Sequence, residues 1–175
     1  METTEQTWLT EEELPTWLTL VGVLIKLPAA LNDQLQRDAG MNHFEYWALM
    51  ALALHEGHSV RMSELAVLTN GSLSRLSQVI SRLEKRGWVR RAPDPTDGRC
   101  TLAILTGDGW EQFVGSFEAH SGEIRRLVFD PLTKAQVRQL REIGHRILRA
   151  VNPDGPDRPS GFKPEIGGFC PDTVC

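Results

Sequence analysis

The sequence predicts a mainly α-helical fold that carries one small β-hairpin. Apolar residues recur at helical spacing in six separate segments of the 175-residue chain. After Gly87 the pattern changes to two short apolar runs around a turn rich in Pro, Asp and Gly. Hydrophobic residues make up 41% of the sequence, which is enough to bury the core of one domain.

A long first helix is predicted over residues 14–39, because Leu, Val, Ile and Trp recur there at helical spacing. Gly40 is expected to end this helix. Pro28 lies inside the pattern and lacks a backbone N–H, so we expect a kink or a break near Leu27. The next helix, residues 44–55, is apolar on nearly all sides and should be almost surrounded by protein.

Two shorter helices are predicted on either side of a tight turn. Residues 55–59 are expected to form a loop, and residues 63–69 the first of the two helices. Asn70 and Gly71 break this helix, because both residues tolerate left-handed backbone angles. The second helix spans residues 73–86. Its predicted apolar face consists of Leu73, Leu76, Val79, Ile80 and Leu83.

A hairpin and two further helices complete the predicted order. Residues 88–91 and 100–105 have the composition of two short strands, and residues 92–99 form the turn between them. A helix is then expected over residues 107–129. A last helix is expected over residues 133–151, with the threonine at its start as the N-cap.

Charge is distributed unevenly along this acidic chain, whose net charge is −4. Residues 1–71 carry three basic and ten acidic side chains, whereas residues 72–99 carry seven basic and three acidic ones. An acidic protein with one basic segment can bind phosphate there and remain soluble elsewhere.

The outer face of the predicted 73–86 helix is polar, and its side chains suit base edges and phosphates. It comprises Ser74, Arg75, Gln78, Ser81, Arg82 and Lys85. The predicted order of elements is that of a winged helix-turn-helix: a short helix, a turn, a second helix with a polar outer face, and then a hairpin. We expect Arg99 to enter a minor groove with Asp97 holding its guanidinium, and Arg90 and Arg91 to meet the DNA backbone.

The stretch that contains RLEKRGWVRR, DPTDGR and LTGDG resembles the DNA-binding core of the MarR (multiple antibiotic resistance regulator) family. The resemblance covers roughly residues 14–150. Within the family, the sequence is similar to a subgroup common in actinobacteria. It implies a homodimeric transcriptional regulator whose two recognition helices bind successive major grooves of a pseudo-palindromic operator in double-stranded DNA. The family positions that meet DNA are occupied by Ser72, Ser74, Arg75, Gln78 and Arg82 on the helix, and by Asp97 and Arg99 on the wing.

The resemblance also implies the domain organisation. One domain over residues 1–152 would contain a DNA-binding core at about 60–106 and dimerisation helices at about 11–39 and 107–151. Residues 153–175 are dominated by Pro and Gly and are predicted to be a mobile tail. Four residues depart from the family pattern. Asn70 replaces the usual turn glycine, Thr69 a usual apolar residue and Gln78 a frequent Arg, which bears on base preference. Glu45 stands where Gln is frequent, and we attach no function to this difference.

Regulators of this family often respond to a small molecule or an oxidant. We expect a repressor of a nearby gene that a small aromatic or apolar effector releases from DNA. The effector is expected to bind in a pocket walled by Tyr46, Trp47, Phe117 and His120. Oxidation of Cys100, which directly follows Arg99, is an alternative trigger. A metal sensor is a further alternative, but the five histidines are scattered and a metal site needs three or four converging ligands. We therefore predict no metal and no cofactor.

Other functional classes have less support. We find no phosphate-binding Gly-rich loop, no nucleophile motif and no HExxH, so an enzyme is not predicted. An alternative is a winged helix that binds a protein partner instead of DNA. The salt dependence of the binding affinity would distinguish the two, because DNA binding weakens steeply with salt. The N-terminus lacks a signal peptide, no apolar run approaches the ~20 residues of a membrane span, and Cys100, Cys170 and Cys175 form no disulfide framework. These features indicate a cytoplasmic protein without a membrane partner.

Overall fold

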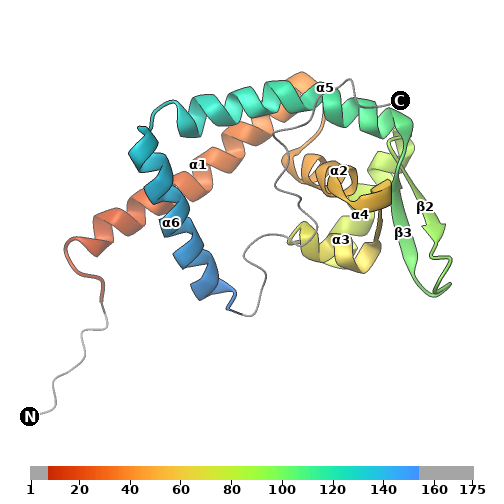
Figure 1. The fold of residues 1–175 in the computed structure, drawn as a ribbon, viewed down its shortest axis with the longest axis horizontal. Coiled ribbons are helices and arrows are strands. Elements are labelled where there is room, and N and C mark those ends of the chain that lie inside the picture. Colours follow the sequence, from red (N-terminus) through yellow and green to blue (C-terminus); the bar gives the residue numbers. More distant parts are fainter. Residues whose placement is uncertain (1–7, 154–175) are drawn as a thin grey trace, which may run out of the picture.

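The computed structural model describes residues 8–153, and most of them are helical (Figure 1). A long helix, α1 (Glu13–Ala39), lies beside α5 (Gly107–Ile124), and α6 (Lys134–Val151) follows at the far end of α5 and crosses α1 in this view. The remaining helices and the sheet form a compact part at the other end of α5. The predicted tail lies outside the described residues except for Pro153, and so do Cys170 and Cys175.

Helix α1 begins and ends close to the predicted residues. Of the kink or break expected near Leu27, the break is wrong. The helix continues through Pro28. A proline removes only its own N–H bond to the preceding turn, and the rest of the hydrogen-bond ladder continues on both sides of it. Gly40 caps the end with φ 62°, a left-handed angle that glycine adopts without steric cost.

By length and composition α1 is apolar enough to cross a membrane, contrary to the expectation that no segment is. The expectation considered uninterrupted apolar runs, whereas mean hydropathy tolerates the threonines here and the single charged residue, Lys26, between Leu14 and Leu31. Its buried residues, Leu31, Gln34 and Leu35, lie near its C-terminal end. Most of its apolar surface is therefore exposed in the single chain.

The core is built around α2 (His43–Leu54), which is as enclosed as predicted. Eight of its twelve residues are buried. Asn42 caps it in a capping box, accepting a hydrogen bond from the backbone N–H of Glu45 while the Glu45 side chain accepts one from Asn42. Since α2 contacts α1, α3, α4, α5 and β3, it holds the two ends of the molecule together.

The two short helices are α3 (Met62–Leu68) and α4 (Leu73–Lys85). Four of the five predicted apolar positions of α4 are buried, namely Leu76, Val79, Ile80 and Leu83. The fifth, Leu73, is 53% exposed. It lies in the first turn of α4, where the helix has only begun to pack against its neighbours.

The predicted hairpin is present as β2 (Val89–Pro93) and β3 (Thr101–Leu105), which pair antiparallel. A third strand, β1 (Ser59–Arg61), lies within and just after the segment expected to be a loop and pairs with the other edge of β3. The short 3-10 turn η1 (Glu56–His58) precedes it. Strand β3 is thus central, and the hairpin is anchored to the chain that enters α3.

The last two helices follow the prediction, with one difference. After α5 the chain continues as a π-helical turn, η2 (Arg125–Phe129), rather than as α-helix. Thr133 caps α6 through a capping box with Gln136, as its sequence position predicts. Within the described chain no residue of α6 is buried, although one face of this helix is apolar.

Candidate nucleic-acid interface

The turn between α3 and α4 sets the start of α4. Asn70 takes the left-handed backbone, with φ 48°, in the place of a glycine. Gly71 is needed for a different reason, because a Cβ there would lie 2.7 Å from Cζ of Phe44. Ser72 accepts a hydrogen bond from the backbone N–H of Arg75 at 3.2 Å and so caps α4.

The outer face of α4 is exposed, as the sequence predicts, at Ser74, Arg75, Gln78, Arg82 and Lys85, whereas Ser81 is half-buried. The guanidinium of Arg75 lies over the ring of Phe44, 4.3 Å from its centroid. This contact orients the arginine without using its hydrogen-bond donors, which remain available to a base edge or a phosphate.

Arg82 has a structural partner that the sequence did not suggest. Its Nε donates to Oε1 of Glu45 at 2.8 Å, and Arg86 lies 4.0 Å from the other oxygen of that carboxylate. Glu45 is buried, so its charge needs these partners. The residue to which we attached no function therefore joins α2 to the C-terminal half of α4.

The predicted backbone contact Arg91 is also engaged within the protein. Its Nη2 donates to the carbonyl of Ser77 at 2.7 Å and to Oγ of Ser81 at 3.1 Å. Its Nη1 lies 2.9 Å from Oε2 of Glu84. Ser81 is half-buried and donates to the same carbonyl. Arg91 and Ser81 thus join β2 to α4, whereas the adjacent Arg90 is exposed.

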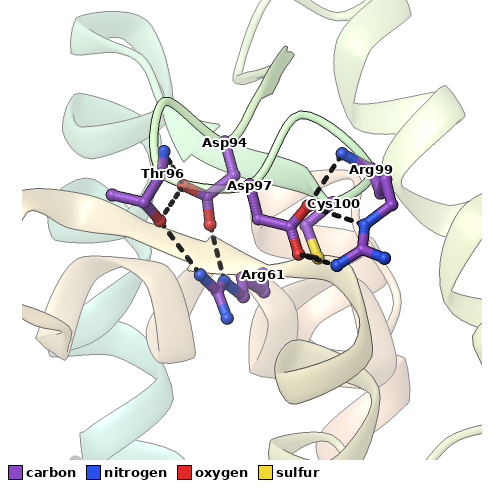
Figure 2. Close-up of polar contacts among 6 residues, drawn as sticks. All are labelled: Arg61, Asp94, Thr96, Asp97, Arg99 and Cys100. Carbon is purple, nitrogen blue, oxygen red and sulfur yellow. Dashed lines mark hydrogen bonds and ion pairs between the residues drawn. The ribbon is translucent and has the colours of Figure 1, made fainter.

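At the tip of the wing, which we define as β2, β3 and the turn between them, the predicted pairing of Asp97 with Arg99 is confirmed. Nε of Arg99 donates to Oδ1 of Asp97 at 3.0 Å, and Nη2 donates to Oδ2 at 3.2 Å (Figure 2). These bonds lower the pKa of Asp97 and keep it charged. The side chain of Arg99 is nonetheless 91% exposed, so the carboxylate holds it outward toward solvent.

A second cluster in the wing was missed by sequence reasoning. Asp94 is buried and accepts hydrogen bonds from Arg61, at the end of β1, and from Thr96 (Figure 2). The bonds from Thr96, then that from Arg61, lower the pKa of Asp94 to about 2. The Asp-Pro dipeptide marks the turn in the sequence, but nothing local to it points to Arg61.

The predicted effector residues are mostly core. His120 is 3% exposed, its Nδ1 lies 2.8 Å from Oε1 of Gln34, and its ring packs against Tyr46. Phe117 packs partly buried against the same core. Trp47 differs, because it lines a cavity of about 590 Å³ between α1, α2 and α4. The cavity lining comprises Pro28, Ala29, Asn32, Asp33, Asn42, His43, Phe44, Trp47, Arg75, Gln78, Val79 and Arg82.

The alternative triggers have different surroundings. Sγ of Cys100 lies 3.7 Å from Oδ2 of Asp97, beside the Asp97–Arg99 pair (Figure 2). Among residues 8–153, no group of three or more His, Cys, Asp or Glu side chains is placed to hold a metal ion.

Comparison with known proteins agrees with this geometry. The family profile described as MarR family matches residues 39–99. Sco3205 of Streptomyces coelicolor, a MarR family transcriptional regulator crystallised in complex with DNA, is 41% identical with a TM-score of 0.80, covering 84% of this chain and 96% of that one. AbsC, a MarR family regulator of the same organism, is 32% identical with a TM-score of 0.79, covering 85% and 99%. The transcriptional repressor MprA of Escherichia coli is 28% identical over 69% of this chain and 68% of that protein.

Proposed function

Since the chain belongs to the MarR family of transcriptional regulators, we propose that it is a homodimeric repressor of a nearby gene, released from DNA by a small aromatic or apolar effector. In this proposal it works in the cytoplasm on a pseudo-palindromic operator. The observation that supports it most is the exposed polar face of α4 together with a wing whose Arg99 is 91% exposed.

The contacts of the predicted DNA-binding side chains divide them into two groups. In our proposal Ser74, Arg75, Gln78 and Lys85 meet the major groove, Arg90 meets phosphates and Arg99 enters a minor groove. Ser72, Ser81 and Arg91 instead hold α4 in place through hydrogen bonds within the protein. Arg82 does both in our proposal, since its Nε bonds to Glu45 while its side chain is 48% exposed. Asp97 orients Arg99.

Dimerisation is supported by two uncovered apolar faces. Helix α1 exposes Leu14, Trp17, Leu18, Val23, Leu24 and Ile25, and α6 exposes Leu140, Ile143, Ile147, Leu148 and Val151. Burial of apolar surface contributes about 25 cal/mol per Å², so two amphipathic helices left in water favour association. A second copy of the chain would cover these faces, and a two-fold dimer matches a pseudo-palindromic operator.

The cavity between α1, α2 and α4 supports an effector site. Phe44 and Trp47 give it aromatic walls, and His43 accepts a hydrogen bond from Trp47 at 2.8 Å. Arg75 and Gln78 line the same cavity and also belong to the proposed DNA-reading face. A small aromatic molecule bound there would compete with DNA for these side chains, which would weaken operator binding.

The test is an anisotropy titration of the purified protein against the duplex upstream of its own gene and against a scrambled duplex, at about 50 and 200 mM salt. We expect preference for the native duplex by about a hundredfold or more. With about ten phosphates contacted, affinity should fall steeply with salt, with a log–log slope near −9. Equal and weak binding to both duplexes, followed by failure of a genome-wide binding selection, would favour the protein-partner alternative.

The effector is tested in the same assay with a panel of small aromatic acids and phenols. A compound that binds in the cavity should release the wild-type protein from its duplex. It should act weakly on Trp47→Leu and normally on Trp8→Leu, since Trp8 is exposed near the N-terminus and outside the cavity. Equal release of both variants would remove this cavity from the mechanism.

A further inference from the structure

Arg61 joins two parts of the DNA-binding core that are far apart in the sequence. Its Nε donates to Oδ2 of Asp94 at 2.6 Å, and its Nη2 donates to Oγ1 of Thr96 at 3.2 Å (Figure 2). Asp94 is 6% exposed, whereas the Arg61 side chain is 45% exposed. We call Arg61, Asp94 and Thr96 the wing clasp.

Both oxygens of the Asp94 carboxylate are used in the wing clasp. The backbone N–H and the hydroxyl of Thr96 donate to Oδ1 at 2.8 and 2.7 Å, while Arg61 occupies Oδ2. The backbone N–H of Asp94 also donates to the carbonyl of Cys100 at 2.9 Å and closes the turn. The wing clasp therefore folds the turn and attaches it to a strand outside the hairpin.

The position of Arg61 in the fold links the helix-turn-helix to the tip of the wing. It is the last residue of β1 and the residue immediately before α3, the first helix of the helix-turn-helix. Thr96, at the other end of the wing clasp, directly precedes Asp97, which holds Arg99. One continuous set of bonds thus runs from the start of α3 to the guanidinium at the tip of the wing.

We infer that Arg61 is a positioning residue for DNA binding, which fixes the wing against the helix-turn-helix so that Arg99 is presented to the minor groove. The inference rests on the proposed function, since it assigns a role within the same interface. The competing explanation is that Arg61, with part of its side chain at the surface, contacts a phosphate directly.

A double-mutant cycle separates these explanations. Arg61→Ala, Arg99→Ala and the double variant are titrated against the operator duplex over a series of salt concentrations. A positioning role predicts that Arg61→Ala weakens binding about tenfold alone and less than about twofold in the Arg99→Ala background. Losses that multiply independently would overturn the inference.

Salt dependence gives a second reading of the same variants. Removing a cation that neutralises a DNA phosphate lowers the log–log slope by about one, and a displaced Arg99 would lower it as much as a lost Arg61 contact. The slopes are therefore compared in the Arg99→Ala background, where adding Arg61→Ala should leave the slope unchanged and adding the exposed Arg90→Ala should lower it. A slope lowered further by Arg61→Ala in that background would show a direct phosphate contact and contradict the inference.

Conservative variants test the geometry of the wing clasp. Arg61→Lys keeps the charge but cannot bond Asp94 and Thr96 together as a planar guanidinium does, so it should restore only part of the affinity. Thr96→Val removes the hydroxyl without changing any charge and should weaken binding in the same direction. Wild-type affinity in Thr96→Val and in Arg61→Ala, both with native circular dichroism, would contradict the wing clasp.

A measurement without DNA keeps the inference separate from the proposed function. Hydrogen–deuterium exchange of the free protein should become faster in peptides covering residues 93–101 in Arg61→Ala, and stay unchanged in α2. Unchanged exchange in the wing would overturn the inference. If wild-type protein binds no specific duplex while wing exchange responds to Arg61→Ala, the proposed function fails and the ordering role of the wing clasp stands.

Discussion

Arg90 and Arg91 are neighbours on β2, yet their surroundings give them different roles. Arg90 is exposed, whereas Arg91 is bonded to Ser77 and Ser81 and paired with Glu84 on α4. Both residues look alike in the sequence, where they form part of one basic segment. In our proposal, the partners that the fold supplies decide which of the two arginines meets DNA.

Arg91→Ala should therefore lower stability, and Arg90→Ala should lower DNA affinity. Loss of the Arg91 guanidinium removes one donor from the Ser77 carbonyl and the ion pair from the Glu84 carboxylate, although the Ser81 hydroxyl and the backbone N–H of residue 91 still bond to them. The cost should be about 1–3 kcal/mol in the free energy of unfolding, because hydrogen bonds to charged groups contribute that much. Arg90→Ala should unfold as the wild type does while its binding becomes weaker and less salt-dependent. Urea unfolding and anisotropy on both variants give the comparison, and interchanged effects would refute the assignment.

Gly109 is required by close packing rather than by its backbone angle. It is the second glycine of LTGDG, and a Cβ at this position would overlap the carbonyl oxygen of Trp88. That oxygen also accepts the backbone N–H of Thr106, so the first turn of α5 lies directly against the residue before β2.

Gly109→Ala should lower the free energy of unfolding by about 2–4 kcal/mol, because backbone atoms must move to admit the methyl group. Gly115→Ala is the matched control in the same helix, since a Cβ there meets nothing within 4 Å. The control should be neutral or stabilising by up to about 1 kcal/mol, owing to the better helix propensity of alanine. Chemical denaturation of both variants measures the difference, and equal stabilities would contradict the packing argument.

At the scale of the elements, the sequence predicts what depends on local pattern. The helices and the hairpin have repeating apolar positions and clear end signals such as Gly40 and Thr133, and the structure contains them. Strand β1 has only three residues, which is too short for a periodic signal. The pairs Glu45–Arg82 and Arg61–Asp94 join residues 37 and 33 positions apart. Ion pairs at that separation leave no trace in a single sequence, so neither the Glu45 partner of Arg82 nor the Asp94 partner of Arg61 could be predicted.

The junction of α1, α2 and α5 contains a buried histidine with consequences for pH dependence. Burial, and then nearby His43, lower the pKa of His120 to about 4, against a smaller opposing effect of Glu123. Tyr46 and Gln34 complete its surroundings without adding charge at neutral pH. Burial lowers the pKa of His43 in the same direction.

Stability should accordingly fall as the pH drops from about 6.5 toward 4. In this range the unfolded chain binds a proton at His120 that the folded chain does not bind, so protonation favours unfolding. The free energy of unfolding should fall by at most about 3 kcal/mol, and the fall should level off below pH 4. His120→Gln should flatten this part of the profile, while the exposed His58→Gln should not. Urea unfolding at several pH values measures it, and an unchanged profile in His120→Gln would show that another group is responsible.

At the scale of the molecule, the single chain combines a well-packed DNA-binding part with two helices that bury little. Within the described chain α6 has no buried residue, and α1 is buried only toward its C-terminal end. The same apolar surface gives α1 the composition of a membrane span, and a partner subunit would account for it without a membrane. Because the operator is proposed to have two half-sites, association of these faces would also set the spacing of the two recognition helices.

A charge on the apolar face of α6 should separate the subunits and weaken DNA binding together. Ile147→Asp places a carboxylate among Leu140, Ile143 and Leu148, where an interface would have to desolvate it. Gln139→Asp adds the same charge on the polar side of α6 and is the control. Sedimentation equilibrium should give the mass of two chains for the wild type and the control, and of one chain for Ile147→Asp. Because a monomer engages one half-site at a time, its operator affinity should fall by about a hundredfold or more. A dimeric Ile147→Asp protein with full affinity would mean that the subunits associate through another surface, and the proposed spacing of the recognition helices would lose its structural basis.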